Sequence, residues 1–313
     1  MSHEKTEPRV IHGILLILLA ILCLSILPPL VRVGLTEAVG PVPLLAIRLV
    51  IATAFLGMVF GLMRPQVFRI DRAGLVACLL VGFSDTVASL CYYNAFTHVS
   101  TSVAHVIFSA YPVLALVLLS FRGERFSLLQ IFGLCFALAG VFLLIGPGGE
   151  VNPVGTLLAL GAGLGYATTL ALTQWLLNGY DARTVTFYVS SAMTILTAAY
   201  WGLQWDGIPR ISPTGWSVIL ITAVVSTALA RLLLFAGIRR AGSGTVALLA
   251  PVETLLAVSW AVVFLGDRLS SIQWVGGALV VISMNLVMRR KSGAASPLRR
   301  LMGRWKSVFT EWI

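Results

Sequence analysis

The sequence has little charge for its length. Charged residues make up 11% of its 313 residues, whereas hydrophobic residues make up 58%. An ordinary soluble domain carries roughly 25% charged residues, so this chain cannot build a water-facing surface of the usual kind. The low charge, with a mean hydropathy of +0.95, excludes a pair of soluble domains and indicates that the surrounding solvent is lipid.

Cysteine and histidine are also scarce, with four residues of each. The cysteines fall inside apolar segments without paired spacing, which indicates neither a disulfide framework nor a zinc site, so we expect no metal. The G-x-S-x-G, H-E-x-x-H, P-loop and G-x-G-x-x-G motifs are missing from positions where they could act. We therefore expect neither a cofactor nor an enzymatic activity. No loop is long enough for a nucleotide-binding domain, which excludes an ATP-driven pump.

Long hydrophobic runs recur along the chain with only short polar breaks. A membrane-spanning helix needs about 20 mainly apolar residues, and the sequence contains about ten such runs. The first run follows Lys5 and Arg9 but is too long for a signal peptide, so we interpret it as a retained helix. We predict an all-α integral membrane protein. Its helices should span about residues 10–33, 41–63, 73–96, 101–120, 128–146, 154–177, 184–203, 214–237, 244–266 and 271–289.

The excess of positive charge is one-sided. Lysine and arginine together number 22 against 12 acidic residues, which gives a net charge of +10. If the N-terminus is cytoplasmic, only Arg32, Arg210 and Arg268 fall in outer loops. This distribution follows the positive-inside rule and predicts a multi-pass protein of the cell's inner membrane with both termini in the cytoplasm. The charge therefore indicates topology, with the lipid bilayer as partner, and not nucleic-acid binding.

The two halves of the chain resemble one another. Because each half holds an odd number of predicted helices, the second half must enter the membrane in the opposite orientation. We predict two inverted repeats of five helices each, residues 1–150 and 151–291, followed by a tail of residues 292–313. The residues that recur at one constant offset are Gly123, Glu124, Arg125, Gln130 and Gly133 in the first half and Gly266, Asp267, Arg268, Gln273 and Gly276 in the second.

An ordered series of short motifs runs through both halves. The motifs are Ala46-Ile47-Arg48, Tyr93-Asn94-Ala95-Phe96, Tyr111-Pro112-Val113, Gly123-Glu124-Arg125-Phe126, Ala250-Pro251-Val252-Glu253 and Gly266-Asp267-Arg268-Leu269. In this order the chain resembles the drug/metabolite transporter superfamily, specifically its EamA-type families. The resemblance covers almost the whole chain and implies a helical bundle with a central cavity that moves amino acids, nucleoside-like compounds or other metabolites. Asp267 and Asp85 depart from the family pattern and leave the substrate open.

Four ionisable side chains lie inside predicted helices, namely Arg48, Asp85, Arg231 and Glu253. Charges at membrane depth are costly and usually face a cavity or a partner. With a rise of about 1.5 Å per residue, Arg48 could reach Asp85, and Arg231 could reach Glu253. For Arg48 we favour a structural ion pair. Asp85 and Glu253 are equally consistent with a structural role and with a substrate or proton site.

Prolines and aromatic residues complete the candidate site. Pro112 and Pro251 interrupt corresponding helices of the two halves, which is a good indication of a transporter's substrate site, although a packing kink is an equal alternative. Pro28 and Pro29 add a third break in the first helix. Other candidates can border the cavity, although each is individually more often a packing residue: Tyr92, Asn94, His105, Tyr111, Tyr166 and Trp260.

Two further segments offer packing or interaction surfaces. Gly161 and Gly165 form a G-x-x-x-G pattern that predicts close helix packing, either within the bundle or between the protomers of a homodimer. In residues 292–313, apolar residues recur at helical spacing among arginines. This pattern predicts an amphipathic helix on the anionic cytoplasmic leaflet, with a disordered basic tail as the alternative.

Together these features predict a secondary transporter that moves a small-molecule substrate, such as an amino acid or a related compound, by alternating access. Export is preferred to uptake, and proton coupling through an intramembrane carboxylate is part of the hypothesis. A facilitative uptake carrier for a vitamin or a nucleoside-like compound is the alternative. A membrane scaffold without transport and an intramembrane enzyme are the alternatives from other classes.

Overall fold

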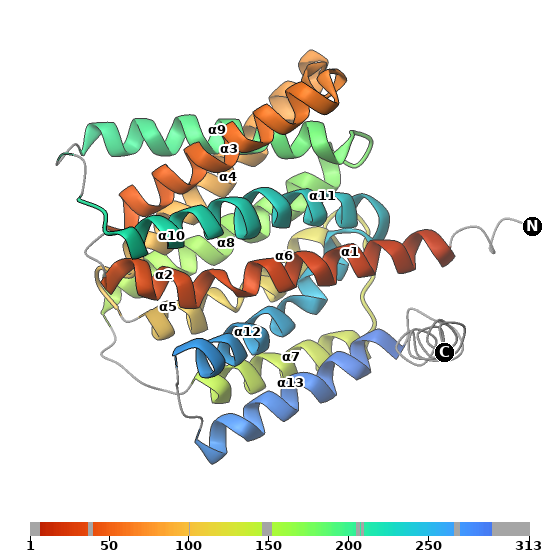
Figure 1. Ribbon diagram of the computed structural model, residues 1–313. Helices are drawn as coiled ribbons and strands as arrows, with labels where there is room; N and C mark the ends of the chain where they lie inside the picture. Colours follow the sequence, from red (N-terminus) through yellow and green to blue (C-terminus); the bar gives the residue numbers. More distant parts are fainter. Residues whose placement is uncertain are drawn as a thin grey trace, which may run out of the picture.

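The computed structural model describes residues 7–36, 40–99, 101–145, 152–204, 207, 210–265 and 270–289, and all regular secondary structure in these segments is helical. The tail at 292–313 and the second-half motif at 266–269 lie outside the described residues. The helices (Figure 1) are α1 (Glu7–Ser25), α2 (Leu27–Thr36), α3 (Pro41–Met63), the 3-10 helix η1 (Pro65–Phe68), α4 (Arg72–Ala95), α5 (Thr101–Phe108), α6 (Tyr111–Ser120), α7 (Leu128–Ile145), α8 (Pro153–Leu176), α9 (Ala182–Leu203), α10 (Pro213–Ile221), the π-helix η2 (Thr222–Leu229), α11 (Ala230–Ala241), α12 (Ser243–Leu265) and α13 (Ser271–Arg289).

Among the described residues, six helical segments are long and apolar enough to cross a membrane, and their ends lie within a few residues of the expected ranges. The prediction of an all-helical fold with several membrane-spanning helices is therefore confirmed. Shorter apolar helices occur at Tyr111–Ser120, Leu128–Leu143 and Ser271–Ser283. The six long segments are Val10–Leu35, Pro41–Met63, Arg72–Ala95, Pro153–Leu176, Pro213–Ala241 and Ser243–Phe264.

The surface of the bundle is apolar, and charged side chains lie inside it. Leu62, Leu157 and Leu203 are highly exposed, whereas Arg48 and Asp85 are buried. A soluble monomer rarely exposes an apolar surface of this extent. Lipid tails can cover such a surface, and the helices satisfy their own backbone hydrogen bonds, as a hydrocarbon environment requires.

Local capping chemistry explains where several helices begin. α8 starts at Pro153, and the Asn152 side chain accepts hydrogen bonds from two amides of the first turn at 2.9 and 3.3 Å. α10 starts at Pro213, and the Ser212 hydroxyl accepts from the Gly215 amide at 3.0 Å. Proline fits the first helical position because its missing N–H would have no intrahelical partner there.

Corresponding helices of the two halves begin with the same cap. At the start of α7, the Ser127 amide donates to Gln130 Oε1 at 2.9 Å, and the Gln130 amide donates to the Ser127 hydroxyl at 3.3 Å. Ser270 and Gln273 form the same reciprocal cap at α13, at 2.8 and 3.4 Å. This is a capping box, with glutamine in the acidic position. Gln130 and Gln273, which recur at the constant sequence offset, thus make the same contact in the two halves.

The packing of the helices also repeats when the halves are exchanged. The segment η2–α11 of the second half corresponds to α4 of the first, α8 corresponds to α1, and α9 corresponds to α3. α4 packs on α8, and in the exchanged arrangement α11 packs on α1. α4 also packs on α9, and in the exchanged arrangement η2 packs on α3. α7 and α13, the last described helix of each half, lie side by side at the lower edge of Figure 1. Two similar units related by an approximate two-fold axis would give this pattern.

The G-x-x-x-G pattern of α8 packs against α4 within the bundle. A Cβ atom added to Gly165 would lie 2.9 Å from the Cβ and 3.1 Å from the Cα of Ala88. The Ser84 hydroxyl also donates to the Gly165 carbonyl at 2.9 Å. At Gly161 there is more space, because an added Cβ would meet only Cys91 Sγ, at 3.8 Å. Gly165 therefore sets the close approach of α8 to α4.

We expect Gly165→Ala to destabilise the protein by about 1–3 kcal/mol, because α8 must move away from the backbone of α4. Gly161→Ala is the matched control on the same helix, and it should be neutral or stabilising by up to about 1 kcal/mol. Thermal unfolding of the detergent-solubilised variants measures both effects. Equal Tm values for the two variants would contradict the assignment of the close contact to Gly165.

Candidate functional site

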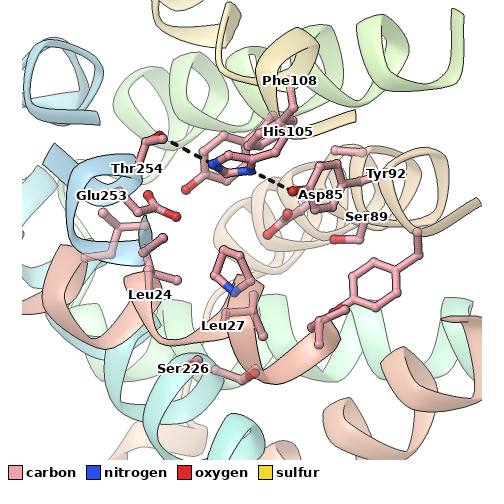
Figure 2. Close-up of a pocket in the computed structure, with 18 of the residues that line it drawn as sticks. Leu24, Leu27, Asp85, Ser89, Tyr92, His105, Phe108, Ser226, Glu253 and Thr254 are labelled. Atoms are coloured by element: carbon pink, nitrogen blue, oxygen red, sulfur yellow. Dashed lines mark hydrogen bonds between the residues drawn. The ribbon is translucent and has the colours of Figure 1, made fainter. Parts of the chain in front are cut away.

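A cavity of about 650 Å³ lies between the two halves of the bundle. Its lining comes from α1 to α5 in the first half and from α8, η2, α11, α12 and α13 in the second. Figure 2 shows Glu253 and Thr254 of α12 across the cavity from Ser89 and Tyr92 of α4. The volume lies within the range of about 300–1,000 Å³ that is typical of small-molecule sites. The sequence candidates that line it are Arg48, Asp85, Tyr92, His105, Tyr166, Arg231 and Glu253.

An ion pair joins the two halves at this cavity. Arg231 Nη1 on α11 lies 2.5 Å from Asp85 Oδ2 on α4, and both side chains are largely buried. The two pairs that helix depth made possible, Arg48 with Asp85 and Arg231 with Glu253, are not formed among the described residues. Distance along a helix fixes depth but not the direction in which a side chain points. The π-helix η2 ends just before Arg231, and its wider turns change that direction relative to a regular α-helix.

Arg48 on α3 is buried without a carboxylate of its own. The residue is 5% exposed, and its Nε and Nη1 atoms have no hydrogen-bond partner among the described residues. Its guanidinium carbon lies 5.6 Å from the centre of the Tyr93 ring, which is within cation–π range. The Tyr93 hydroxyl is likewise buried without a hydrogen-bond partner in the described segments. The structural ion pair that we favoured for Arg48 is therefore not formed with any described carboxylate.

Glu253 on α12 is another ionisable residue of the described cavity lining. Within the part of the chain that the structure describes, no hydrogen bond or ion pair engages its carboxylate. Tyr92 and Tyr166 border the same cavity as Glu253, and Tyr111 borders the small adjoining hollow that Glu253 also lines. These are neutral phenols, so the Glu253 carboxylate has aromatic neighbours but no counter-ion there.

A hydrogen-bonded chain through His105 crosses from the first half to the second. The Tyr92 hydroxyl on α4 lies 2.7 Å from His105 Nδ1, and His105 Nε2 on α5 lies 3.3 Å from Thr254 Oγ1 on α12. Figure 2 draws both bonds as dashed lines. A neutral imidazole donates from one ring nitrogen and accepts at the other, so either tautomer can satisfy this chain. The chain connects α12 to α4 beside Glu253.

We expect Tyr92→Phe to destabilise the protein by about 1–3 kcal/mol, because it leaves the buried His105 Nδ1 without its partner. Thr254→Val is the control at the other end of the chain. It should cost less, because its bond to the imidazole is longer, at 3.3 Å. Thermal unfolding of the purified variants compares them, and a greater loss for Thr254→Val would contradict the view that the Tyr92 bond is the stronger one.

Several sequence candidates lie away from the main cavity. The Asn94 side chain donates to the Leu90 carbonyl of its own helix at 2.8 Å. Trp260 donates to the Ser25 hydroxyl on α1 at 2.9 Å and therefore packs two helices together. Tyr111 and Pro251 border a small adjoining hollow of about 10 Å³, next to Glu253.

The three proline positions behave differently. α1 ends at Ser25 and α2 begins at Leu27, so the helix breaks just before Pro28 and Pro29, as expected. α5 ends at Phe108 and α6 begins at Tyr111, so a break precedes Pro112. The expected matching break at Pro251 is wrong, because α12 continues through it. Proline removes one backbone donor, and in α12 the rest of the ladder holds the helix together.

The sequence candidates omit several polar residues of the lining. Tyr93 belongs to one of the ordered motifs but not to the predicted site, and Thr254 follows Glu253 directly. Thr169 and Thr173 of α8 are one turn apart, which is the spacing of a polar stripe on an otherwise apolar helix. That stripe is the signal that identifies these two threonines from sequence. Among the described residues, no three His, Cys, Asp or Glu side chains gather to hold a metal ion.

Comparison with protein families and curated proteins finds transporters. The profile of the EamA-like transporter family matches residues 11–146 and, a second time, residues 153–289. The uncharacterized transporter YcbK of Bacillus subtilis (strain 168) is 24% identical over 268 residues, which cover 81% of this chain and 86% of that protein. The pseudopaline exporter CntI of Pseudomonas aeruginosa (strain UCBPP-PA14) is 22% identical over 289 residues, which cover 90% of this chain and 97% of that protein.

Comparison with solved structures supports the fold. One crystal structure superposes with a TM-score of 0.75 at 20% sequence identity, and the match covers 88% of this chain and 95% of the other. At this identity the likeness shows the architecture alone. The relatives therefore indicate that the protein is a transporter. Its substrate has to be inferred from the side chains that line the cavity.

Proposed function

Because this chain belongs to the EamA-like transporter family, we propose that it carries amino acids or related small metabolites across the membrane by alternating access. The observation that carries this proposal is the cavity of about 650 Å³ between the two halves, with Arg48 and Glu253 in its lining, neither of which forms an ion pair within the described segments. Charges at membrane depth are costly, and a scaffold without transport would have no use for them. A site between two related halves can open to either side as the halves move.

We further propose that the chain crosses the inner membrane about ten times, as two inverted repeats with cytoplasmic termini. The family profile matches each half once. The shared capping box of α7 and α13 and the exchange symmetry of the packing support a repeat. The one-sided distribution of arginine supports the orientation.

Export coupled to proton entry is the preferred mode. One relative is an exporter by name, which supports this direction. Glu253 is the favoured proton site, because Asp85 is engaged by Arg231 whereas the Glu253 carboxylate has no counter-ion among the described residues. A carboxylate that gains and loses a proton changes the charge of the cavity lining, and intramembrane carboxylates commonly serve as proton relays.

Transport by purified protein in liposomes tests the proposal. Liposomes loaded with unlabelled amino acids should accumulate labelled amino acid by exchange, and a pH gradient should drive net flux. Nucleosides and vitamins are tested in parallel, and protein-free liposomes are the control. Saturable flux of a vitamin or nucleoside alone would favour the facilitative uptake carrier. The absence of saturable flux for every compound would contradict the transport function.

A further inference from the structure

A second hollow, of about 370 Å³, adjoins the main cavity at one end of the bundle. Ile238 of α11 is buried and borders both spaces. Thr173 of α8 lines the cavity, and the next residue, Gln174, lines the hollow. A thin layer of side chains around these three residues therefore separates the two spaces.

The hollow lies at the arginine-rich end of the bundle. Arg125, Arg239 and Arg240 border it, and the orientation proposed above places this end at the cytoplasm. The hollow is enclosed by the loop between α6 and α7, the end of α8 and the link between α11 and α12. Figure 1 shows the loop between α6 and α7 at the right-hand end of the view, where α1 begins and α13 ends.

The main cavity extends toward the opposite end. Its lining includes Arg32 near the end of α2, Phe96 at the C-cap of α4 and Gln273 in the first turn of α13. Arg32 is exposed, so the cavity reaches the surface on that side. Toward the hollow, the last lining residues are Thr173 and Ile238, and both are buried. The passage is thus closed at the arginine-rich end.

The Gln174 side chain uses both ends of its amide in this closure. Its Nε2 donates to Glu124 Oε1 at 2.7 Å, and its Oε1 accepts from the Ser243 amide at 2.6 Å. A backbone amide can only donate, so the amide oxygen must face Ser243 and the amide nitrogen must face Glu124. Glu124 belongs to the first half of the chain, and Gln174 and Ser243 belong to the second. The bond to Glu124 therefore joins the two halves.

Two further contacts hold the loop between α6 and α7 against the second half. The Arg122 guanidinium carbon lies 4.7 Å from the centre of the Trp175 ring on α8, which is within cation–π range. The Phe126 ring lies against the start of α12, because a Cβ atom added to Gly244 would lie 2.9 Å from Phe126 Cε1. The loop is therefore fixed to the second half at three points, on one side of the layer that closes the cavity.

We propose that Gln174 is the latch of a cytoplasmic gate. Its bonds to Glu124 and Ser243 hold the passage closed, and the hollow is the entrance through which the cargo reaches the cavity when these bonds open. This inference rests on the proposed transport function and orientation. Halves that rock against one another around a central site must break their contacts at one end in every cycle. Hydrogen bonds suit this task, because water replaces each lost partner when the gate opens.

Labelling of a cysteine in the cavity tests the latch without a measurement of transport. Ser89 on α4 borders the cavity, and Ser89→Cys places a thiol there. A membrane-impermeant maleimide is added to right-side-out or to inside-out vesicles, and the protein without Ser89→Cys gives the background from its native cysteines. The introduced thiol should react faster from the outer face, because the latch closes the cytoplasmic end.

Gln174→Leu removes both hydrogen bonds at a similar side-chain size. It should raise the labelling rate from the cytoplasmic face at least about tenfold, because the loss of a hydrogen bond to a charged group shifts an equilibrium by about that factor. The rate from the outer face should not rise. Gln204→Leu is the matched control, since Gln204 is exposed and bonds only to Tyr200 of its own helix, and it should change neither rate.

An exchange of the two side chains distinguishes the latch from general packing. Gln174→Glu alone opposes two carboxylates and should also raise labelling from the cytoplasmic face. In the double variant Gln174→Glu with Glu124→Gln, the donor and the acceptor change places, and the carboxylate still accepts from the Ser243 amide. Labelling should then return to the wild-type rates. A double variant that labels like Gln174→Glu would overturn the proposal.

Two other results would also overturn it. Gln174→Leu could leave the cytoplasmic rate unchanged, or it could raise the rates from both faces equally, as a general loosening of the bundle would. Saturable flux in liposomes together with either result contradicts the latch and leaves transport standing. The absence of saturable flux for every compound contradicts the proposed function itself, whatever the labelling shows.

Discussion

Glu253→Gln should abolish the stimulation of transport by a pH gradient. Glutamine keeps the size and polarity of the side chain but cannot bind and release a proton. Because no counter-ion engages Glu253 among the described residues, its charge is free to change without breaking an existing ion pair. Flux into liposomes, measured with and without a gradient at the same internal pH, should become equal in the variant.

Asp181→Asn is the control for this experiment. Asp181 caps α9, and its side chain is 55% exposed, so the variant should keep the full response to the gradient. If Glu253→Gln also responds normally, proton coupling through this residue is wrong, and facilitated diffusion becomes the preferred mode. A response that is lost only in Asp85→Asn would move the proton site to Asp85.

Asp85→Asn should destabilise the protein by about 3–5 kcal/mol, because it leaves Arg231 buried without its carboxylate. Arg48 borders the same cavity, so the variant would hold two positive charges in that lining without a described ion-pair partner. The double variant Asp85→Asn with Arg231→Gln removes one of these charges and should recover much of the lost stability. Thermal unfolding in detergent measures Asp85→Asn, Arg231→Gln and the double variant.

The two single variants and the double variant form a double-mutant cycle, which measures the coupling energy between Asp85 and Arg231. A coupling energy of well over about 1 kcal/mol between Asp85 and Arg231 is expected for a direct buried pair. If the losses of the two single variants simply add in the double variant, the residues do not interact in the folded protein. The pair joins α4 to α11, so that result would also remove one contact between the halves.

The sequence predicts the positions of the helices well, for simple physical reasons. A membrane requires apolar segments of a minimum length, and α3 meets this requirement between Pro41 and Met63, in agreement with the expected range. Proline and capping residues mark the starts of α3, α8 and α10. The buried charges are also recognisable, because an arginine or carboxylate inside an apolar helix is costly and needs a partner or a cavity to face.

The partners of these charges could not be predicted. Counting residues along a helix gives the depth of Arg48 and of Arg231, but the pairing depends on the rotation of each helix and on which helices are neighbours. The π-helix η2 alters the rotation just before Arg231. The contact of Trp260 could not be predicted for the same reason: its indole donates to the Ser25 hydroxyl on α1, and the residue is not part of the described cavity lining.

The unequal prolines of the two halves have a mechanical consequence. The helix is interrupted between α5 and α6, just before Pro112, whereas its counterpart α12 is continuous through Pro251. In an inverted repeat that works by exchange of shapes, each half must adopt the form now seen in the other. The reverse-facing molecule would then carry its helix break at Pro251 and an uninterrupted helix at Pro112, so these two prolines would act as paired hinges that flex in turn.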